Sequence, residues 1–235
     1  MIICGKNTVF EAIRSKRKIT KIIILESNKE LYKRVSDLTN VEIKLMSLNQ
    51  MNKICSDNHQ GIIAYTDEYE YVELTNMINK NKQKDAVLVA LANLEDPHNL
   101  GAILRTADAT LIDGVIIPKN RSVSLNSTVA KVSTGAIEHV DVCQVANLVT
   151  TLETLKKNGY WIIGLEMEGS IDYRKQDYSG KIVVVIGSEG KGIPRLVKEA
   201  CDFMVNIPMY GHVTSLNASV SASLLFYEIL RNRGK

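Results

Sequence analysis

Residues Val183–Pro194 read VVVIGSEGKGIP, a run of aliphatic residues that passes directly into a loop with three glycines. The unbroken apolar run predicts a strand buried on both faces of a parallel sheet. Gly187, Gly190 and Gly192 lie within six residues, which favours a close approach of the backbone to a ligand. Their spacing fits neither a Walker A loop nor the dinucleotide-binding GxGxxG pattern. The stretch therefore predicts a ligand loop, with neither ATP nor NAD indicated.

Further apolar strands and helices alternate along the chain on both sides of this stretch. The predicted strands are Val87–Ala90, Gly114–Ile117, Trp161–Gly164, Val183–Ile186 and Met204–Ile207. The predicted helices are Leu100–Ala109, Thr128–Ala136, Leu148–Lys157, Ile193–Ala200 and Ser219–Leu230. This alternation predicts an α/β fold with a mainly parallel sheet covered by helices. Ligands of such sheets bind beyond the carboxyl ends of the strands.

A second strand-end segment follows the strand that begins at Val87. Pro97 is expected to stop strand pairing, and Asn99 is expected to cap the next helix. Arg105 comes six residues after Asn99, nearly two helical turns later, so the two side chains could share one face toward a ligand. The alternative is purely structural, with Asn99 as a helix cap and Arg105 as a surface residue.

A third strand-end segment lies before the C-terminal helix. Its strand is expected to stop at Pro208, and a loop containing glycine follows. Ser215, Asn217 and Ser219 then stand at the start of the predicted helix. Any one of them can cap it, so three small polar residues exceed what a cap requires. The exposed start of a helix also offers backbone N–H groups to an anion.

The first 70 residues form a separate α/β pattern. Its predicted helices are Asn7–Ser15, Ser27–Leu38 and a short helix that is capped by Ser47 and runs through Cys55. Its predicted strands are Lys21–Leu25, Val41–Met46 and Gly61–Tyr65. A polar stretch at 79–85 is the best boundary in the chain, although a short helix at Leu74–Ile78 is possible. The expected division is therefore a small domain at 1–70, a linker at 71–85 and a larger domain at 86–235.

Composition is ordinary for a globular protein, with 45% hydrophobic and 23% charged residues among 235. The apolar runs are too short to cross a bilayer, and the N-terminus lacks the pattern of a signal peptide. We therefore expect a cytoplasmic protein that does not enter the membrane. The four cysteines form no CxxC pair, which favours reduced, partly buried thiols over a metal site.

The net charge of +3 is unevenly distributed. Residues 1–84 contain 14 Lys or Arg and 10 Asp or Glu, an excess of +4. Much of this excess lies in one basic cluster, formed by Arg14, Lys16, Arg17, Lys18 and Lys21. The cluster could contact the phosphates of a nucleic acid. A solvated helix end explains it equally well.

The three strand-end segments together resemble the three signature motifs of the SpoU (TrmH) family of RNA ribose 2′-O-methyltransferases. The matching stretches are DPHNLGAILRTADA at 96–109, VVVIGSEGKGIP at 183–194 and IPMYGHVTSLNASVSASLLFYE at 207–228. HQGI at His59–Ile62 resembles the RNA substrate-binding domain of the family, which has an L30e-like shape. The two-domain layout is most similar to family members that methylate a guanosine ribose in 23S rRNA.

The resemblance implies several further properties. The catalytic domain should contain a trefoil knot, the protein should be a homodimer that binds RNA without a metal, and the cofactor should be S-adenosyl-L-methionine. The positions that match cofactor contacts of the family are Gly187, Ile207 and Leu216. The positions that match its functional polar residues are Asn99, Arg105, Glu189, Ser215 and Asn217.

The resemblance nominates Arg105 to activate the ribose hydroxyl. A guanidinium has a pKa above about 12 and is not normally a base. Arg105 would therefore act either as a base assisted by an adjacent phosphate, or as a phosphate ligand that stabilises developing charge. Two other functions stay open. The substrate could be tRNA or the rRNA site of the thiostrepton-resistance methylases, or the chain could be an RNA-binding module without catalytic activity.

Overall fold

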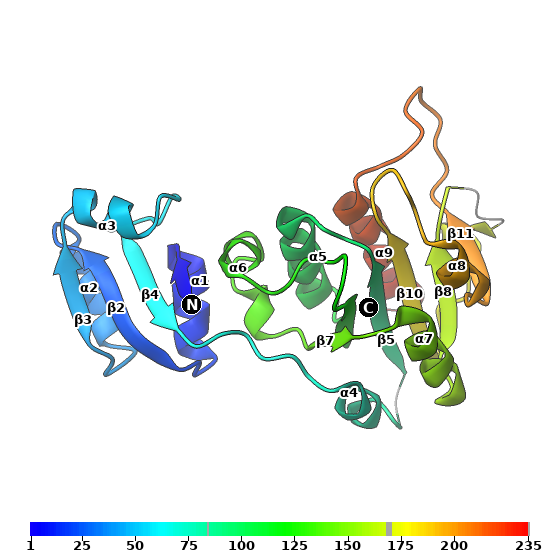
Figure 1. The fold of residues 1–235 in the computed structure, drawn as a ribbon, viewed down its shortest axis with the longest axis horizontal. Coiled ribbons are helices and arrows are strands. Elements are labelled where there is room, and N and C mark those ends of the chain that lie inside the picture. The colour runs from blue at the N-terminus through cyan, green and yellow to red at the C-terminus, as the bar shows by residue number, and fades with distance from the viewer. Residues whose placement is uncertain (84, 168–170, 235) are drawn as a thin grey trace. The chain divides into compact units, whose positions relative to one another are not determined.

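The computed structural model describes residues 1–83, 85–167 and 171–234 and contains two compact units (Figure 1). One consists of Met1–Glu70 with Leu125–His139, and the other of Tyr71–Ser124 with Val140–Lys235. Leu125–His139 thus belongs to the N-terminal unit, although the sequence division places it within 86–235. The expected linker includes Lys84, and the expected catalytic domain includes 168–170 and Lys235, all of which lie outside the described residues.

The N-terminal unit is built on a four-stranded sheet with the order β1-β4-β2-β3. Strand β4 runs antiparallel to β1 and β2, and β3 runs parallel to β2. The strands are β1 (Ile2–Cys4), β2 (Ile19–Leu25), β3 (Ile43–Met46) and β4 (Ile62–Thr66). The helices are α1 (Lys6–Arg14), α2 (Lys29–Ser36) and α3 (Leu48–Ile54). The predicted helices and strands are all present. Strand β1 was not predicted, because three residues are too few to show a periodic pattern.

Local side-chain chemistry explains two boundaries of this unit. The cap expected at Ser47 is confirmed, since the Ser47 N–H donates to Gln50 Oε1 at 3.0 Å in a capping box. The HQGI stretch forms the turn into β4. There His59 is buried, and its Nδ1 accepts the Gly61 N–H at 3.0 Å, which fixes a backbone with φ +82° at Gly61.

The inserted segment joins the N-terminal unit through a buried charge cluster. The segment contains α6 (Ser127–Val132) and a 3₁₀ turn at Ala136–Glu138. The Glu138 carboxylate accepts the Tyr69 hydroxyl at 3.0 Å and lies 3.6 Å from Arg17 Nη1. The Arg17 guanidinium in turn stacks on the Tyr69 ring at 3.5 Å from its centroid. These contacts connect the segment to the first 70 residues.

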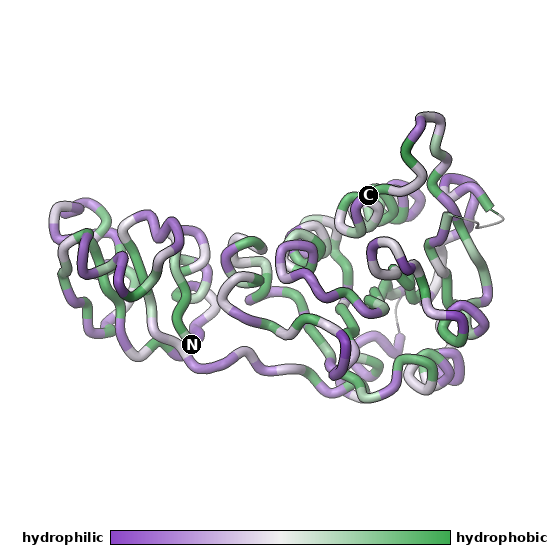
Figure 2. Tube along the Cα trace, turned by 45° about the horizontal axis from the view of Figure 1, so that its top comes forward, coloured by the Kyte–Doolittle hydropathy of each residue, from purple (hydrophilic) through white to green (hydrophobic). Residues whose placement is uncertain are grey.

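The second unit contains a seven-stranded parallel sheet with the order β7-β6-β5-β10-β8-β11-β9. Its strands are β5 (Ala86–Ala92), β6 (Gly114–Pro118), β7 (Val142–Val145), β8 (Trp161–Leu165), β9 (Ile171–Asp172), β10 (Lys181–Gly187) and β11 (Phe203–Asn206). All residues of β5 and Ile182–Ile186 of β10 are buried, and Figure 2 shows hydrophobic stretches running through the interior of this unit. The predicted α/β fold with a parallel sheet is therefore confirmed.

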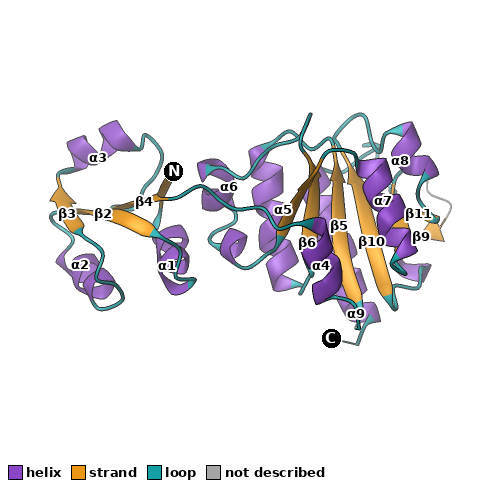
Figure 3. Ribbon diagram, turned by 60° about the horizontal axis from the view of Figure 1, so that its bottom comes forward, coloured by secondary structure: helices purple, strands orange, loops and turns teal. Residues whose placement is uncertain are grey.

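Helices cover both faces of this sheet. They are α4 (Leu74–Lys80), α5 (Pro97–Ala109), α7 (Leu148–Lys157), α8 (Arg195–Glu199) and α9 (Ala218–Asn232), with a 3₁₀ turn at Tyr173–Lys175. Helices α4, α7 and α8 pack on one face in a shared apolar cluster, and α5 packs against α9 on the other, as Figure 3 shows. No helix in the described part of the chain is long and apolar enough to cross a membrane.

Strand register brings the ends of four strands to one edge of the sheet. Gly187 of β10 lies beside Ala92 of β5, and Ile186 beside Leu165 of β8, which itself pairs with Val205 of β11. Because the strands are parallel, the chain leaves all four at the same carboxyl edge. The loops that follow them are therefore held close together, as the sequence predicted for the three strand-end segments.

Candidate functional site

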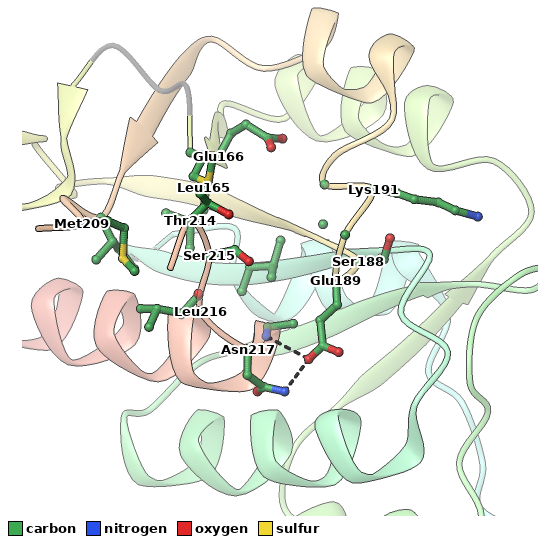
Figure 4. Close-up of a pocket in the computed structure, with 18 of the residues that line it drawn as sticks. Leu165, Glu166, Ser188, Glu189, Lys191, Met209, Thr214, Ser215, Leu216 and Asn217 are labelled. Carbon is green, nitrogen blue, oxygen red and sulfur yellow. Dashed lines mark hydrogen bonds between the residues drawn. The ribbon is translucent and has the colours of Figure 1, made fainter. Parts of the chain in front are cut away.

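A cavity of about 720 Å³ opens at this carboxyl edge (Figure 4). Three loops form its wall, and they follow β8, β10 and β11. The residues that line it are Leu165, Glu166, Met167, Ile186, Gly187, Ser188, Glu189, Gly190, Lys191, Gly192, Lys198, Ile207, Met209, Thr214, Ser215, Leu216, Asn217, Ala218 and Ser221. A cavity of this size accommodates a ligand as large as a nucleoside derivative.

The loop after β10 approaches itself closely at two glycines. A Cβ atom on Gly187 would lie 2.2 Å from the carbonyl carbon of Gly192. Gly190 and Gly192 have φ values of +77° and +62°, in the left-handed region that favours glycine. The Gly192 N–H also donates to the Ser188 carbonyl at 2.9 Å. The sequence predicted a close approach of the backbone to a ligand. The structure shows a close approach of the loop to itself, between Gly187 and Gly192, which makes the loop a compact part of the cavity wall.

Glu189 connects this loop to helices α5 and α9. Its Oε1 accepts Asn99 Nδ2 at 3.1 Å and the Ala218 N–H at 3.3 Å. The same oxygen accepts Asn217 Nδ2 (Figure 4). This Asn217 amide also donates to Asn99 Oδ1 at 2.9 Å. The motifs at 96–109, 183–194 and 207–228 thus each contribute one side chain to a single polar cluster, Asn99–Glu189–Asn217.

Asn99 and Arg105 lie differently from what the sequence predicts. Asn99 does not cap α5, because Asp96 does so by accepting the His98 N–H at 2.9 Å. The buried Asn99 side chain is therefore available to Glu189. Asn99 and Arg105 also do not share a face, since six residues make about 1.7 turns of helix. Arg105 is exposed and does not line the cavity.

The remaining expected site residues lie in the cavity wall. Gly187, Ile207 and Leu216, expected to contact a cofactor, all line it. So does Ser215, which is exposed in the loop before α9. Of the three candidate caps of α9, Asn217 performs the role by accepting the Ser219 N–H at 2.9 Å. The structure therefore brings together every expected site residue except Arg105.

The sequence interpretation missed the part of the wall that follows β8. Leu165, Glu166 and Met167 line the cavity there. Glu166 Oε2 accepts the Ile193 N–H at 3.0 Å and lies 3.3 Å from Lys198 Nζ. The rule about strand carboxyl ends, applied to the predicted strand Trp161–Gly164, would have found these residues.

The basic cluster near the N-terminus is largely paired within its own unit. The ion pairs are Arg14–Glu11, Arg17–Glu138, Lys18–Asp67 and Lys21–Glu42. Arg17 is mostly enclosed, with only 11% of its side chain exposed. This pairing lowers the positive charge available to phosphates and favours a structural role for much of the cluster.

All four cysteines are free thiols. Burial raises the pKa of Cys143 to about 11 and that of Cys201 to about 12. Burial and the neighbouring Cys55 thiol, whose sulfur lies 2.8 Å away, raise the pKa of Cys4 to about 12. None of the four cysteines is among the residues that line the cavity, so its chemistry falls to its oxygen and nitrogen groups.

Comparison with known proteins agrees with this geometry. The sequence profile of the SpoU rRNA Methylase family matches residues 86–227, and a profile described as RNA 2′-O ribose methyltransferase substrate binding matches residues 2–72. A protein of Staphylococcus saprophyticus named "Putative TrmH family tRNA/rRNA methyltransferase" is 49% identical over 99% of this chain and 96% of its own length.

Two solved structures have a similar fold. The SpoU methyltransferase AviRb from Streptomyces viridochromogenes, in complex with AdoMet, superposes with a TM-score of 0.86 at 20% identity, over 100% of this chain and 91% of that one. A structure described as an RNA 2′-O ribose methyltransferase gives a TM-score of 0.82 at 26% identity, over 100% of this chain and 89% of that one. The chain therefore belongs to the SpoU rRNA Methylase family of RNA methyltransferases.

Proposed function

We propose that the protein transfers a methyl group from S-adenosyl-L-methionine to a ribose 2′-oxygen of RNA, and that the substrate is a guanosine in 23S rRNA. The observation that carries this proposal is the cavity at the carboxyl edge, with Glu189 and Asn217 in its wall and Asn99 bonded to both. Family membership supports methyl transfer to RNA. The ribose oxygen is supported by the substrate-binding profile and by the description of one similar structure.

The residues of the cavity fit the proposed cofactor. Leu165, Ile207, Met209 and Leu216 offer apolar surface for the adenine ring and the methylene groups of the cofactor, and backbone groups of the glycine loop lie beside them. When bound, the cofactor supplies a methyl group on a sulfonium, which is a good leaving group. The bound structure of AviRb supports a cofactor of this kind in this fold.

The polar cluster has a positioning role in this proposal. Glu189 Oε1 binds two side-chain amides and one backbone N–H, so it fixes the loop after β10 against the start of α9. Ser215 stands in the same wall and is free to contact the ribose or its phosphate. Arg105 would bind an RNA phosphate and stabilise charge that develops as the hydroxyl loses its proton.

The N-terminal unit would supply RNA binding in this proposal. The substrate-binding profile covers residues 2–72, and the methylase profile covers residues 86–227. On that basis we propose an N-terminal domain at 1–70, a linker at 71–85 and a catalytic domain at 86–235. The N-terminal domain would be L30e-like, and the catalytic domain would contain a trefoil knot. The relative from Staphylococcus is named for both tRNA and rRNA, so the rRNA substrate rests on the resemblance of the two-domain layout. The protein would act in the cytoplasm, where its RNA substrate is found.

We further propose that the protein is a homodimer. Val220, Leu224 and Tyr227 follow one another on α9 at spacings of four and three residues, so they form one stripe. Their exposed fractions are 46%, 40% and 53%, whereas Ala222, Leu225 and Phe226 on the opposite face are buried. An apolar stripe on an outer helix face is suited to pairing with a second copy of itself.

One experiment tests the proposed reaction and substrate together. Labelled S-adenosyl-L-methionine is incubated with the protein and total RNA from a strain that lacks it, and the labelled nucleotide is then mapped. We expect label on one ribose 2′-oxygen of a guanosine in 23S rRNA. Label in tRNA would retain the chemistry and overturn the substrate. Absence of label, together with no binding of S-adenosyl-L-methionine, would favour an RNA-binding module without activity.

A further inference from the structure

Glu166 occupies an unexpected position in the cavity wall. It follows the last residue of β8, and only 17% of its side chain is exposed. Its Oε2 accepts the Ile193 N–H at 3.0 Å and lies 3.3 Å from Lys198 Nζ. The charge of this carboxylate is thus balanced by a cation, and one of its oxygens has a backbone donor. Both partners, Ile193 and Lys198, belong to the segment that follows β10.

We infer that Glu166 is a positioning residue that holds the loop Gly187–Ile193 in the form that binds the cofactor. This inference rests on the proposed function for its ligand. The loop depends on such support because its exposed residues 189–191 and its two glycines with positive φ confer little rigidity. Glu189 fixes the middle of the loop to α9, and Glu166 fixes its end at Ile193.

Packing around Gly192 supports the same role. A Cβ atom at this position would lie 2.5 Å from Glu166 Oε1 and 2.9 Å from Oε2. The carboxylate therefore rests directly against the Gly192 backbone, and any side chain there would displace it from Ile193. Gly192 also packs on Gly187 at the other end of the loop. One carboxylate thus supports the point where the two ends of the loop meet.

Its location separates Glu166 from the Asn99–Glu189–Asn217 cluster. Figure 4 shows Glu166 on one side of the cavity and the Glu189–Asn217 pair on the other. Removing Glu166 should therefore weaken cofactor binding and leave the polar cluster intact. We expect the turnover rate at saturating cofactor to change little, while the dissociation constant rises.

The test compares Glu166→Ala with Glu166→Gln, whose carbonyl oxygen still accepts the Ile193 N–H. The first measurement is hydrogen exchange at the Ile193 amide in the cofactor-free protein. Loss of a hydrogen bond to a charged group should accelerate this exchange about 10- to 100-fold in Glu166→Ala, and much less in Glu166→Gln. Glu153→Ala, which alters an exposed carboxylate on α7, serves as the matched control.

The second measurement is calorimetric binding of S-adenosyl-L-methionine, together with turnover at saturating cofactor. We expect the dissociation constant to rise about tenfold or more in Glu166→Ala, with partial rescue in Glu166→Gln. Unchanged exchange at Ile193 in Glu166→Ala would overturn the inference, as would equal defects in both variants. If the wild-type protein fails to bind the cofactor, the proposed function fails. The exchange experiment still tests the support of the loop.

Discussion

Asn99 and Asn217 stand 118 residues apart in the chain, yet their side chains are joined by a hydrogen bond of 2.9 Å. Both amides also donate to one carboxylate oxygen, Glu189 Oε1. A single acceptor therefore ties together α5, the glycine loop and the start of α9. Because each amide group has its partners within the cluster, the geometry is fixed before any ligand arrives.

Replacing Glu189 should disrupt this cluster in a graded way. Glu189→Ala leaves the Asn99 amide, the Asn217 amide and the Ala218 N–H without their shared acceptor. We expect methyl transfer to fall about 10- to 100-fold in kcat/KM, since hydrogen bonds to a charged group contribute about 1.5–3 kcal/mol. Glu189→Gln retains a carbonyl oxygen and should lose less activity. Equal losses in the two variants would show that charge, and not the acceptor, is what matters.

Two glycines in neighbouring loops offer a matched comparison. A methyl group at Gly187 would meet the backbone of Gly192 at 2.2 Å, whereas one at Gly211 has open space and no positive φ. We expect Gly187→Ala to destabilise the protein by about 1–3 kcal/mol and to abolish cofactor binding, because the loop must move away from β10. Gly211→Ala should resemble the wild type. Thermal unfolding and calorimetric titration with S-adenosyl-L-methionine measure both effects.

Sequence patterns predicted the long elements well because burial dictates their residues. Strand β5, strand β10 and helix α7 were all found from continuous apolar runs or helical periodicity. Strands β1, β7 and β9 were missed, because they have four residues or fewer and their edge positions leave little pattern. The grouping of Leu125–His139 with the N-terminal unit was also missed, since it depends on contacts of Glu138 with distant residues.

The site residues that could be predicted are those that the neighbouring sequence marks, whereas contacts between distant segments could not be predicted. Gly187 and Asn217 could be selected from the sequence because they stand beside a strand end or a helix start. The bond of Asn99 to Glu189 could not be predicted, since an asparagine that caps a helix and one that is buried look identical in a single sequence. Glu166 was overlooked because nothing in its own neighbourhood is unusual. Its contact with Ile193 depends on the pairing of β8 with β10, which joins segments that are distant in the sequence.

The buried cluster of the N-terminal unit predicts a marked effect on stability. Glu138 is 6% exposed and receives the Tyr69 hydroxyl, while burial and this carboxylate raise the pKa of Tyr69. Glu138→Ala leaves the Arg17 guanidinium without its carboxylate partner in a mostly enclosed site. We expect a loss of about 3 kcal/mol in unfolding free energy, measured by urea denaturation. Lys18→Ala breaks an exposed ion pair and should cost less than about 1 kcal/mol.

The apolar stripe on α9 predicts the assembly state. Leu224→Glu would place a charge in the middle of the proposed interface, between Val220 and Tyr227. We expect the variant to sediment as a monomer, because desolvating an unpaired carboxylate opposes association. Glu153→Ala on α7 should keep the wild-type mass. A monomeric wild-type protein at micromolar concentration would remove the homodimer from the proposal.

Arg105 provides the sharpest test of the chemistry. Its side chain is exposed on α5, and among the described residues the structure gives it no hydrogen bond or ion pair. It also lies outside the cavity wall, so its guanidinium is free for RNA and not engaged with the cofactor site. We expect Arg105→Ala to reduce methyl transfer by at least about 100-fold, the loss typical for removal of one charge-stabilising group. Binding of S-adenosyl-L-methionine should stay within about twofold of wild type, because no residue that lines the cavity changes.

Arg105→Lys separates the two possible roles. Lysine keeps the positive charge but loses the planar fork that binds a phosphate with two parallel hydrogen bonds. If Arg105 binds phosphate and stabilises charge, the variant should keep part of the activity, with a pH profile like that of the wild type. If Arg105 acts as a base, activity of the variant should rise steeply with pH, because a lysine loses its proton more easily than an arginine. Lys157→Ala, which removes an exposed cation from α7, controls for a general loss of positive charge. Near-normal turnover in Arg105→Ala would remove this residue from the reaction and direct the search for the activating group to Ser215.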